Sequence, residues 1–305
     1  MLEEGKRAQT QVIVLISIVI LGSCLGNLSQ TALNAMFSGM AADFGVQMEL
    51  GQWVTTLYML VLGITVPVVT YLMRRFPLKN VVLAALLLLV IGAAIDVAAP
   101  SFEVLVAGRA LQAVSAGITM PMMISIVMTS FPRDKQATVM GITGIAMGFA
   151  PNIGPTIGGW MIGFAGWRSF FVALFICAFV LLLLAAVLIA RRPQANSSAR
   201  LDVLSLLLSA LGFGGLLLGF SNASSFGLAS PYIWVPAILG ALFLALYLRR
   251  QKHVEHPLTN LRIFDSWRYR VSFWAANALF ASFMGITLII PLFIENQWGG
   301  TARQA

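Results

Sequence analysis

Charged residues are scarce in this chain of 305 residues. Only 10% are Asp, Glu, Lys or Arg and 59% are hydrophobic, whereas ordinary soluble domains carry about a quarter charged residues. This composition excludes a soluble globular domain and predicts an integral membrane protein. Cysteine is scarce too. Cys24 and Cys177 both lie in apolar runs, which favours buried small hydrophobic side chains over a disulfide or a metal pair.

Signatures of enzymes and of nucleic-acid binding are also missing. There is no Walker loop, no dinucleotide glycine fingerprint, no G-x-S-x-G elbow and no clustered carboxylate pair on a soluble domain. The net charge is +8, but the basic residues form short clusters between apolar runs rather than a face interleaved with aromatics. His253 and His256 stand in a solvated segment, where two lone histidines are more typical of unliganded side chains. We therefore predict no enzyme, cofactor, metal or nucleic-acid partner, and any pumping must use an ion gradient.

Long apolar runs divide the chain into membrane spans. A helix needs about 20 apolar residues to cross the hydrocarbon core, and about nine runs satisfy this rule. The first run follows Lys6 and Arg7 but has no obvious cleavage site, so we interpret it as an uncleaved helix rather than a signal peptide. The predicted spans are 12–34, 51–73, 81–99, 104–128, 138–162, 169–190, 203–220, 232–248 and 271–294.

Basic residues orient these spans. They gather in the N-terminal segment and in alternate connections, while the opposite connections hold only Arg168 and Arg303. The positive-inside rule therefore places the N-terminus in the cytoplasm of a multi-pass plasma-membrane protein. A polar linker at 191–200 follows six spans, and a longer basic segment at 249–270 is expected at the cytoplasmic surface. Six spans, a linker and further spans suit the two-halves plan of secondary transporters.

Arg109 is the most informative polar residue of the spans. It lies about five residues into the fourth span, where a charge is costly and normally faces a cavity or a partner. Gln112 follows it on a face of otherwise small residues. Two interpretations stay open, a charge at the edge of a transport cavity and a structural arginine bonded to backbone carbonyls. Asp96 in the third span is a candidate partner at similar depth, although it also lies near enough to the interface to be solvated.

The fifth span is rich in helix breakers. Two prolines and three glycines fall between Ala150 and Gly159, which a soluble helix would not tolerate. In a membrane, neighbouring helices re-satisfy the freed backbone groups, and glycines allow close helix contact. We predict a bent helix with one stripe of small residues that opens and closes during transport, with packing alone as the alternative. The assigned residues are Gly148, Pro151, Gly154, Pro155, Gly158 and Gly159.

The first span carries a polar stripe at helical spacing. Such a face must contact protein or water in a membrane. We interpret it as cavity lining, with hydrogen bonding between helices as the competing account. The candidates are Asn27, Gln30, Thr31 and Asn34, joined by Tyr58 of the second span.

These motifs resemble the major facilitator superfamily, and within it the fourteen-helix drug:proton antiporters of the EmrB/QacA type. The segment Arg109–Gln112, followed by Gly117, is similar to the family's fourth-helix motif. Gly154–Gly159 matches its antiporter motif in helix five, and Trp167–Phe171 resembles the segment that follows it. The resemblance covers essentially the whole chain.

The sequence also departs from the family pattern. The loop Thr70–Lys79 lacks the usual glycines and aspartate, and Ser29 stands where the first helix usually carries an acidic residue. The chain stops at what resembles the approach to helix ten. By this resemblance we expect a C-terminal truncation that leaves out the later helices of the second half.

The resemblance implies an all-α polytopic bundle of the major-facilitator type in three parts. These are an N-terminal six-helix half at 1–192, a linker with two inserted transmembrane helices at 193–255, and the start of the C-terminal half at 256–305.

The resemblance further implies a secondary active transporter that exports lipophilic or cationic drugs or toxic compounds in exchange for protons, by alternating access. Its partners would be a small-molecule substrate, protons and the lipid bilayer. Arg109, Gln112 and Asp96 are the candidates for proton coupling. Transport of a specific metabolite and a fragment that does not transport are the alternatives.

Overall fold

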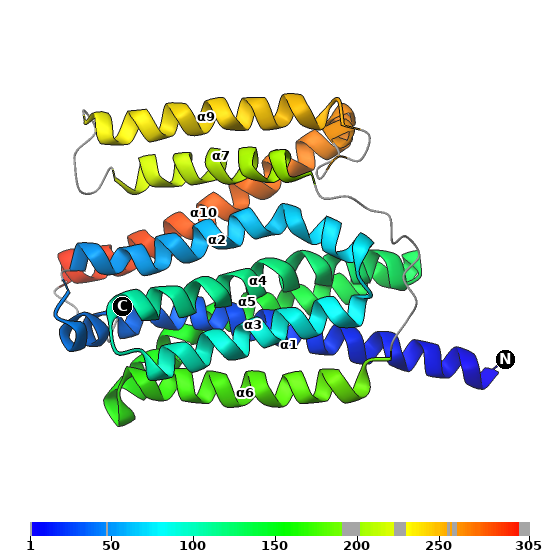
Figure 1. Cartoon of the computed structure of the whole chain (residues 1–305), viewed down its shortest axis with the longest axis horizontal. Coiled ribbons are helices and arrows are strands. Elements are labelled where there is room, and N and C mark those ends of the chain that lie inside the picture. The colour runs from blue at the N-terminus through cyan, green and yellow to red at the C-terminus, as the bar shows by residue number, and fades with distance from the viewer. Residues whose placement is uncertain are drawn as a thin grey trace. The chain divides into compact units, whose positions relative to one another are not determined.

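The computed structural model consists of long helices (Figure 1). It describes the backbone of residues 2–46, 48–190, 202–222, 230–254, 257 and 261–298. It describes the side chains of the same residues except 2–9, 34, 38, 48–53, 164 and 283–298.

The helices follow one another through the whole described chain. In order they are α1 (Leu2–Phe44), α2 (Met48–Arg75), α3 (Leu78–Ala98), α4 (Phe102–Ser130), α5 (Arg133–Ala165), α6 (Trp167–Leu188), α7 (Val203–Ser221) and α9 (Pro231–Gln251), then the short 3-10 helix η1 (Leu261–Asp265) and α10 (Trp267–Trp298).

Two prolines set helix boundaries on one side of the bundle. A residue that precedes proline is disfavoured in the helical region, so α2 ends before Phe76-Pro77 and α4 before Phe131-Pro132. Phe131 is accordingly extended, with φ −107° and ψ 142°. Pro77 and Pro132 then precede the first residues of α3 and α5, where a missing N–H removes no helical hydrogen bond.

Eight helices in the described part of the chain are long and apolar enough to cross a membrane. They coincide with the first eight predicted spans, so the all-α polytopic fold is confirmed. The ninth predicted span, 271–294, lies inside α10, and because its side chains from residue 283 onward are not described it stays a prediction. The eight are Thr10–Leu33, Val54–Arg75, Leu78–Ala98, Phe102–Ser130, Arg133–Gly163, Trp167–Leu188, Val203–Ser221 and Pro231–Gln251.

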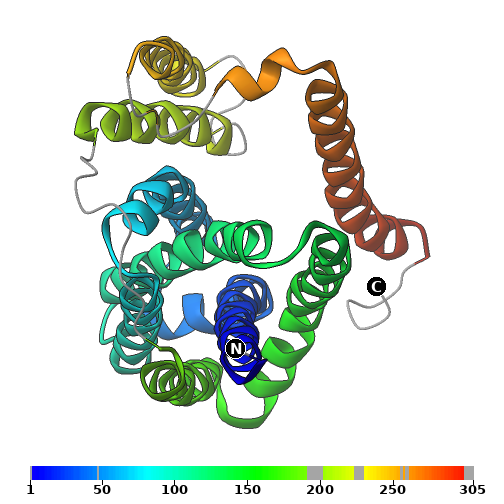
Figure 2. The same cartoon turned by 90° about the vertical axis from the view of Figure 1, so that its right-hand side faces the viewer.

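The chain divides into two compact units, Met1–Arg249 and Arg250–Ala305. In the first unit α1 is central, with α4, α5 and α6 packed against it (Figure 2). Helix α3 packs on both α4 and α6, α2 packs on α4, and α7 packs on α2. In the second unit η1 packs against the start of α10. The predicted three-part division at 192 and 255 stays a prediction.

The apolar core of the first unit has two main parts. Val19 of α1 and Met122 of α4 belong to one cluster, and Met36 of α1 and Leu105 of α4 belong to the other. Between the two clusters, both helices carry buried polar side chains. This polar layer is the candidate site.

Candidate functional site

Four buried polar side chains from three helices form one network. They are Ser29 of α1, Asp96 of α3, and Arg109 and Gln112 of α4. Residues three apart on a helix share a face, which brings Arg109 and Gln112 together. Arg109 is 1% exposed and the other three are fully buried. The network therefore lies inside the protein, closed off by the surrounding helices.

Gln112 links the cation of this network to its carboxylate. Arg109 Nη1 donates to the Ser29 hydroxyl at 2.5 Å and to Gln112 Oε1 at 2.6 Å. The Ser29 hydroxyl donates to the same Gln112 oxygen at 2.8 Å, and Gln112 Nε2 donates to Asp96 Oδ2 at 2.6 Å. Because an amide oxygen only accepts and an amide nitrogen only donates, these bonds determine how the Gln112 amide is oriented. The Gln112 amide therefore connects Arg109 and Asp96, which form no direct ion pair with each other.

The two charged ends of the network are incompletely bonded. Asp96 Oδ1 and Arg109 Nε and Nη2 have no hydrogen-bond partner among the described residues. A buried charged group that lacks partners is costly, so such atoms need an explanation. Both hydrogen bonds that Arg109 Nη1 donates go to side chains, those of Ser29 and Gln112. Arg109 is thus bonded to side chains and enclosed by helices, and its part in transport stays a prediction.

Tyr58 of α2 covers the guanidinium. Its ring centroid lies 4.5 Å from Arg109 Cζ, and its hydroxyl donates to the Gly26 carbonyl of α1 at 3.2 Å. The ring is fully buried. A cation over an aromatic face is stabilised by the ring quadrupole, most strongly where water is excluded. Arg109 is therefore contacted from α1, from α2 and from its own helix.

Two glycines, Gly92 of α3 and Gly108 of α4, allow these helices to approach closely and leave space for Asp96. A Cβ added at Gly108 would overlap the Asp96 carboxylate, and one added at Gly92 would lie 2.6 Å from the Gly108 carbonyl oxygen. Glycine at both positions lets the two backbones meet. The Asp96 carboxylate therefore packs directly against the α4 backbone at Gly108, the residue that precedes Arg109.

One face of α5 packs tightly on α1. A Cβ at Gly158 would lie 2.7 Å from the Ala32 carbonyl oxygen, and one at Gly154 would overlap the Thr31 hydroxyl. Both glycines are buried. At Gly158 the neighbouring atoms belong to the Ala32 backbone, so no side chain can move aside to admit a larger residue there.

The other small residues of α5 lie on a different face. Gly148 and Gly159 have no described atom within 4 Å of an added Cβ beyond their own helical turn, and Pro155 is exposed. At about 100° per residue, Gly154 and Gly158 stand about a quarter-turn away from this open face. The residues expected along one stripe are thus divided between a closed and an open surface, with Pro151 half-buried between them.

The polar stripe of α1 reaches its neighbours. Asn27 Nδ2 donates to Met147 Sδ of α5 at 3.8 Å, and Gln30 Nε2 donates to Met59 Sδ of α2 at 3.5 Å. Thr31 Oγ donates to the Asn27 carbonyl of its own helix at 3.1 Å. The side chain of Asn34 lies outside the described residues. Cavity lining and helix contact both stay predictions for this stripe.

A second polar cluster joins α1, α3 and α6 at their ends, and the sequence reasoning did not single it out. Asp43 Oδ2 accepts from Trp167 Nε1 at 2.7 Å and from Arg168 Nη1 at 3.2 Å. Arg168 Nη2 donates to the Ala99 carbonyl at 3.2 Å. The rarity of basic residues in these connections points to Arg168, but it does not distinguish Asp43 from Glu49 and Glu103 as its partner.

No group of three or more His, Cys, Asp or Glu side chains that could hold a metal ion occurs among the described residues. His256, one member of the sequence pair, lies outside those residues.

Long apolar helices around a buried polar layer define the class of multi-pass membrane proteins. The chain belongs to the Major Facilitator Superfamily, whose sequence model matches residues 19–301. This confirms the superfamily named from the motifs, while the fourteen-helix antiporter family stays a prediction.

Three relatives illustrate the match. The chain is 33% identical over 283 residues to the uncharacterized MFS-type transporter YcnB of Bacillus subtilis, which covers 93% of this chain and 60% of the relative. It is 33% identical over 288 residues to the lincomycin resistance protein LmrB of the same organism, covering 92% and 59%. It is 27% identical over 281 residues to the multidrug resistance protein B homolog of Mycobacterium tuberculosis, covering 91% and 52%. The chain therefore spans between about half and three-fifths of the length of these relatives.

Solved structures with the same fold are transporters as well. A crystal structure of the peptide transporter POT in complex with sulfate matches with a TM-score of 0.62 at 13% identity, covering 94% of this chain and 61% of that one. A bacterial homolog of the human lysosomal transporter Spinster matches with a TM-score of 0.53 at 17% identity, covering 92% and 66%. At these identities the likeness concerns the fold alone.

Proposed function

We propose that this chain belongs to a proton-coupled exporter of lipophilic or cationic drugs or toxic compounds. It would lie in the plasma membrane with its N-terminus in the cytoplasm, and it would work by alternating access. The observation that carries the proposal is the buried relay from Asp96 through Gln112 to Arg109. The names of two relatives, a lincomycin resistance protein and a multidrug resistance protein homolog, support the substrate class.

Asp96 is the proposed proton carrier. It is the only acidic side chain that is buried among the described residues. Ser29, which stands where the resembling family usually has an acid, contacts Arg109 directly but cannot carry a titrating charge. The carboxylate therefore reaches the arginine from α3, through Gln112, instead of from α1.

Protonation would change the charge balance of the whole relay. When Asp96 is ionised, its negative charge and the positive charge of Arg109 cancel within one buried layer. When Asp96 binds a proton, Arg109 becomes an uncompensated buried cation, which is costly until it reaches water or an anion. This change in free energy would favour one conformation of the helices over the other, which couples proton binding to movement.

The two surfaces of α5 suit a moving seal. Gly154 and Gly158 hold one side of the helix against α1, while the open face around Gly148 and Gly159 is free to form another contact. We propose that this open face makes and breaks a helix contact during the transport cycle. The anchored face would keep α5 with α1 throughout.

The relay is tested by replacing Asp96 with Asn in the purified protein in proteoliposomes. Asn imitates the protonated carboxyl, and its amide oxygen can still accept from Gln112, but it leaves Arg109 without a counter-charge. We therefore expect some loss of stability, and circular dichroism and substrate binding check that the variant is folded. Export of a cationic dye driven by a pH gradient should fall to the level measured without a gradient. Glu103→Gln is the matched control, because Glu103 is an exposed acid at the start of α4. Gradient-driven export that survives in Asp96→Asn would refute the assignment.

The substrate class is tested separately. Expression in a drug-hypersensitive strain should raise resistance to lipophilic cations, and Arg109→Ala should abolish that resistance. Unchanged susceptibility across cationic dyes, combined with proton-driven uptake or export of a metabolite, would favour a metabolite transporter on the same scaffold. Absence of any gradient-driven flux would favour a fragment that does not transport.

A further inference from the structure

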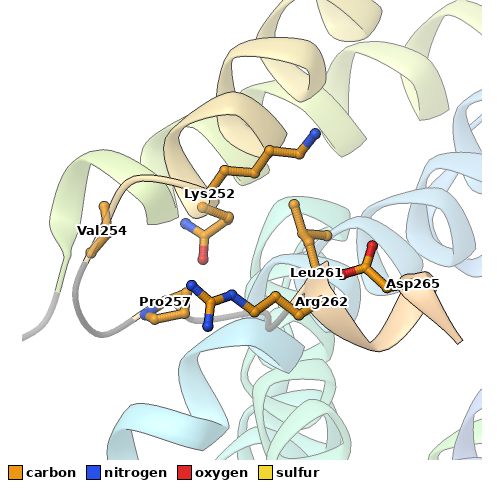
Figure 3. A pocket seen from close by; sticks show the side chains of 7 residues that line it. Lys252, Val254, Pro257, Leu261, Arg262 and Asp265 are labelled. Atoms are coloured by element: carbon orange, nitrogen blue, oxygen red, sulfur yellow. The ribbon is translucent and has the colours of Figure 1, made fainter.

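A pocket of about 510 Å³ lies in the second unit, where the end of α9 leads through a turn to η1 (Figure 3). Gln251 and Lys252 line it from the end of α9 and the turn that follows, and Leu261, Arg262 and Asp265 line it from η1. In Figure 3 the Arg262 side chain extends across the pocket toward Pro257, while Asp265 lies beside Leu261. The pocket thus combines cationic, anionic, amide and apolar groups within the volume typical of a small-ligand site.

The segment around this pocket is strongly basic. Between Arg249 and Arg270 the sequence has six basic residues, Arg249, Arg250, Lys252, Arg262, Arg268 and Arg270, and two acidic ones, Glu255 and Asp265. Clusters of this size directly beside a membrane helix attract anionic lipids. Because α10 begins at Trp267, the cluster stands at the entry of an apolar helix. Its position favours a ligand that is held at the membrane surface.

The same segment carries aromatic side chains of the kind found at membrane–water interfaces. The ring of Phe264 contacts those of Tyr269 and Phe273, with centroids 5.1 and 5.2 Å apart. Trp267 is exposed, and the Arg270 guanidinium lies 5.4 Å from the centre of its ring. Tyr and Trp gather at the headgroup level of membranes because one part of each ring system is apolar and the other polar.

We propose that this pocket binds the headgroup of an anionic glycerophospholipid with a polyol head, of which phosphatidylglycerol is the simplest. Arg262 and Lys252 hold the phosphodiester, for which the guanidinium is well shaped. Asp265 and Gln251 accept hydrogen bonds from the head hydroxyls, and Leu261 and Pro257 contact the glycerol backbone.

Asp265 determines which anion fits. A second negative charge in the pocket would be repelled by this carboxylate, so a doubly charged phosphate is disfavoured relative to a phosphodiester. Hydroxyl groups, in contrast, are donors that a carboxylate accepts well. The pocket therefore selects a singly charged lipid head over phosphatidic acid or free phosphate. This inference concerns a lipid partner and does not depend on the proposed transport function.

The experiment measures retention of dioleoyl phosphatidylglycerol on the purified full chain by native mass spectrometry, with phosphatidylcholine as reference. In Lys252→Gln/Arg262→Gln we expect phosphatidylglycerol affinity to fall by about fivefold per removed charge, while phosphatidylcholine retention stays unchanged. The matched control is Arg268→Gln/Arg270→Gln, which removes the same charge from the same segment outside the pocket lining. An equal loss in both double variants would mean diffuse surface attraction and would overturn the pocket.

Two further arms identify the ligand. Asp265→Asn should reduce the preference for phosphatidylglycerol over phosphatidic acid, because it removes the repulsion of the second charge. Inorganic phosphate and glycerol 3-phosphate, added to the lipid-free protein, should give no thermal stabilisation at concentrations where phosphatidylglycerol does. The lipid assignment would be overturned if either soluble anion stabilised the protein, if Lys252→Gln/Arg262→Gln abolished this stabilisation, and if no lipid were retained. The pocket would then be a site for soluble phosphate. Helicity by circular dichroism, equal among variants, excludes unfolding as the cause.

Discussion

The consecutive helices α4 and α5 differ in how far their surfaces are buried. Helix α4 buries Arg109 and Gln112 in a hydrogen-bonded layer shared with α1 and α3. Helix α5 leaves much of its surface uncovered, including Ile145 at 74% and Phe149 at 64% exposure. The polar residues of α4 are thus held by many contacts, while α5 is held mainly on its α1 side.

The glycines on the open face of α5 suit a helix contact better than they suit a surface for lipid. Large apolar residues suit contact with acyl chains, and other helices of this protein expose them too. Glycines add no apolar contact, but they allow another backbone to come close. Gly148 and Gly159 provide this property on a face that has no close neighbour among the described residues. We infer that α4 belongs to the fixed frame of the unit and that α5 presents its variable contact.

The largest expected loss of stability comes from removing the charge of Arg109 in α4. Arg109→Met keeps the side-chain bulk but leaves Asp96 as a buried acid without its compensating cation. Removing one partner from a buried charged pair typically costs about 3–5 kcal/mol, so we expect a destabilisation of that order. The measurement is denaturant unfolding in detergent micelles.

A double variant separates the charge from the packing at this site. Arg109→Met combined with Asp96→Asn makes the layer neutral, so it should recover most of the stability lost in Arg109→Met alone. A double variant that is no more stable than the single one would show that Arg109 and Asp96 are not coupled, and the frame would then depend on packing only.

The next effect contrasts two adjacent glycines of α5. Gly158→Ala places a methyl group against the Ala32 carbonyl oxygen, and overpacking of this kind typically costs about 1–3 kcal/mol. Gly159→Ala meets no described neighbour, so its stability should stay within about 0.5 kcal/mol of the unsubstituted chain. Thermal unfolding of both variants in the same detergent gives the comparison.

Gly159→Leu extends this comparison from folding to transport. A leucine on the open face should leave the fold stable but obstruct the approach of another helix, so gradient-driven export should fall while unfolding is unchanged. Unchanged export in Gly159→Leu would show that the open face faces lipid throughout and that α5 is not the variable contact.

The membrane spans could be predicted because the bilayer imposes a length on every apolar run. Eight helices therefore agree with the sequence, and the rise of a helix per residue predicts that Asp96 and Arg109 lie at a similar depth in the membrane, as they do. Depth alone does not determine the lateral direction in which each side chain points. That direction depends on helix rotation and crossing, which place the Gln112 amide between the two charges instead of allowing a direct pair.

The other contacts that the sequence did not predict also depend on how the helices pack and rotate. Ser29 and Tyr58 contact Arg109 from helices that are distant in sequence, and only packing of three helices brings them together. The division of the α5 glycines follows from helical geometry, since Gly154 and Gly158 stand about a quarter-turn from Gly148 and Gly159. A helical projection of the sequence contains that information, whereas the contact of Asp43 with Arg168 needs the fold.

The smallest expected effect concerns the aromatic cover of the fixed frame. Tyr58→Phe removes the hydrogen bond to the Gly26 carbonyl but keeps the ring over Arg109, so a loss of about 1 kcal/mol is expected. Tyr58→Leu also removes the cation–π contact, and it should cost about a further 0.5–2 kcal/mol. Both are measured by denaturant unfolding, and each is repeated in the Arg109→Met background. There the additional loss from Phe to Leu should shrink, because no cation remains above the ring. An additional loss that is the same in both backgrounds would mean that Tyr58 stabilises α2 by packing, and the guanidinium would then depend on α1 and α4 alone.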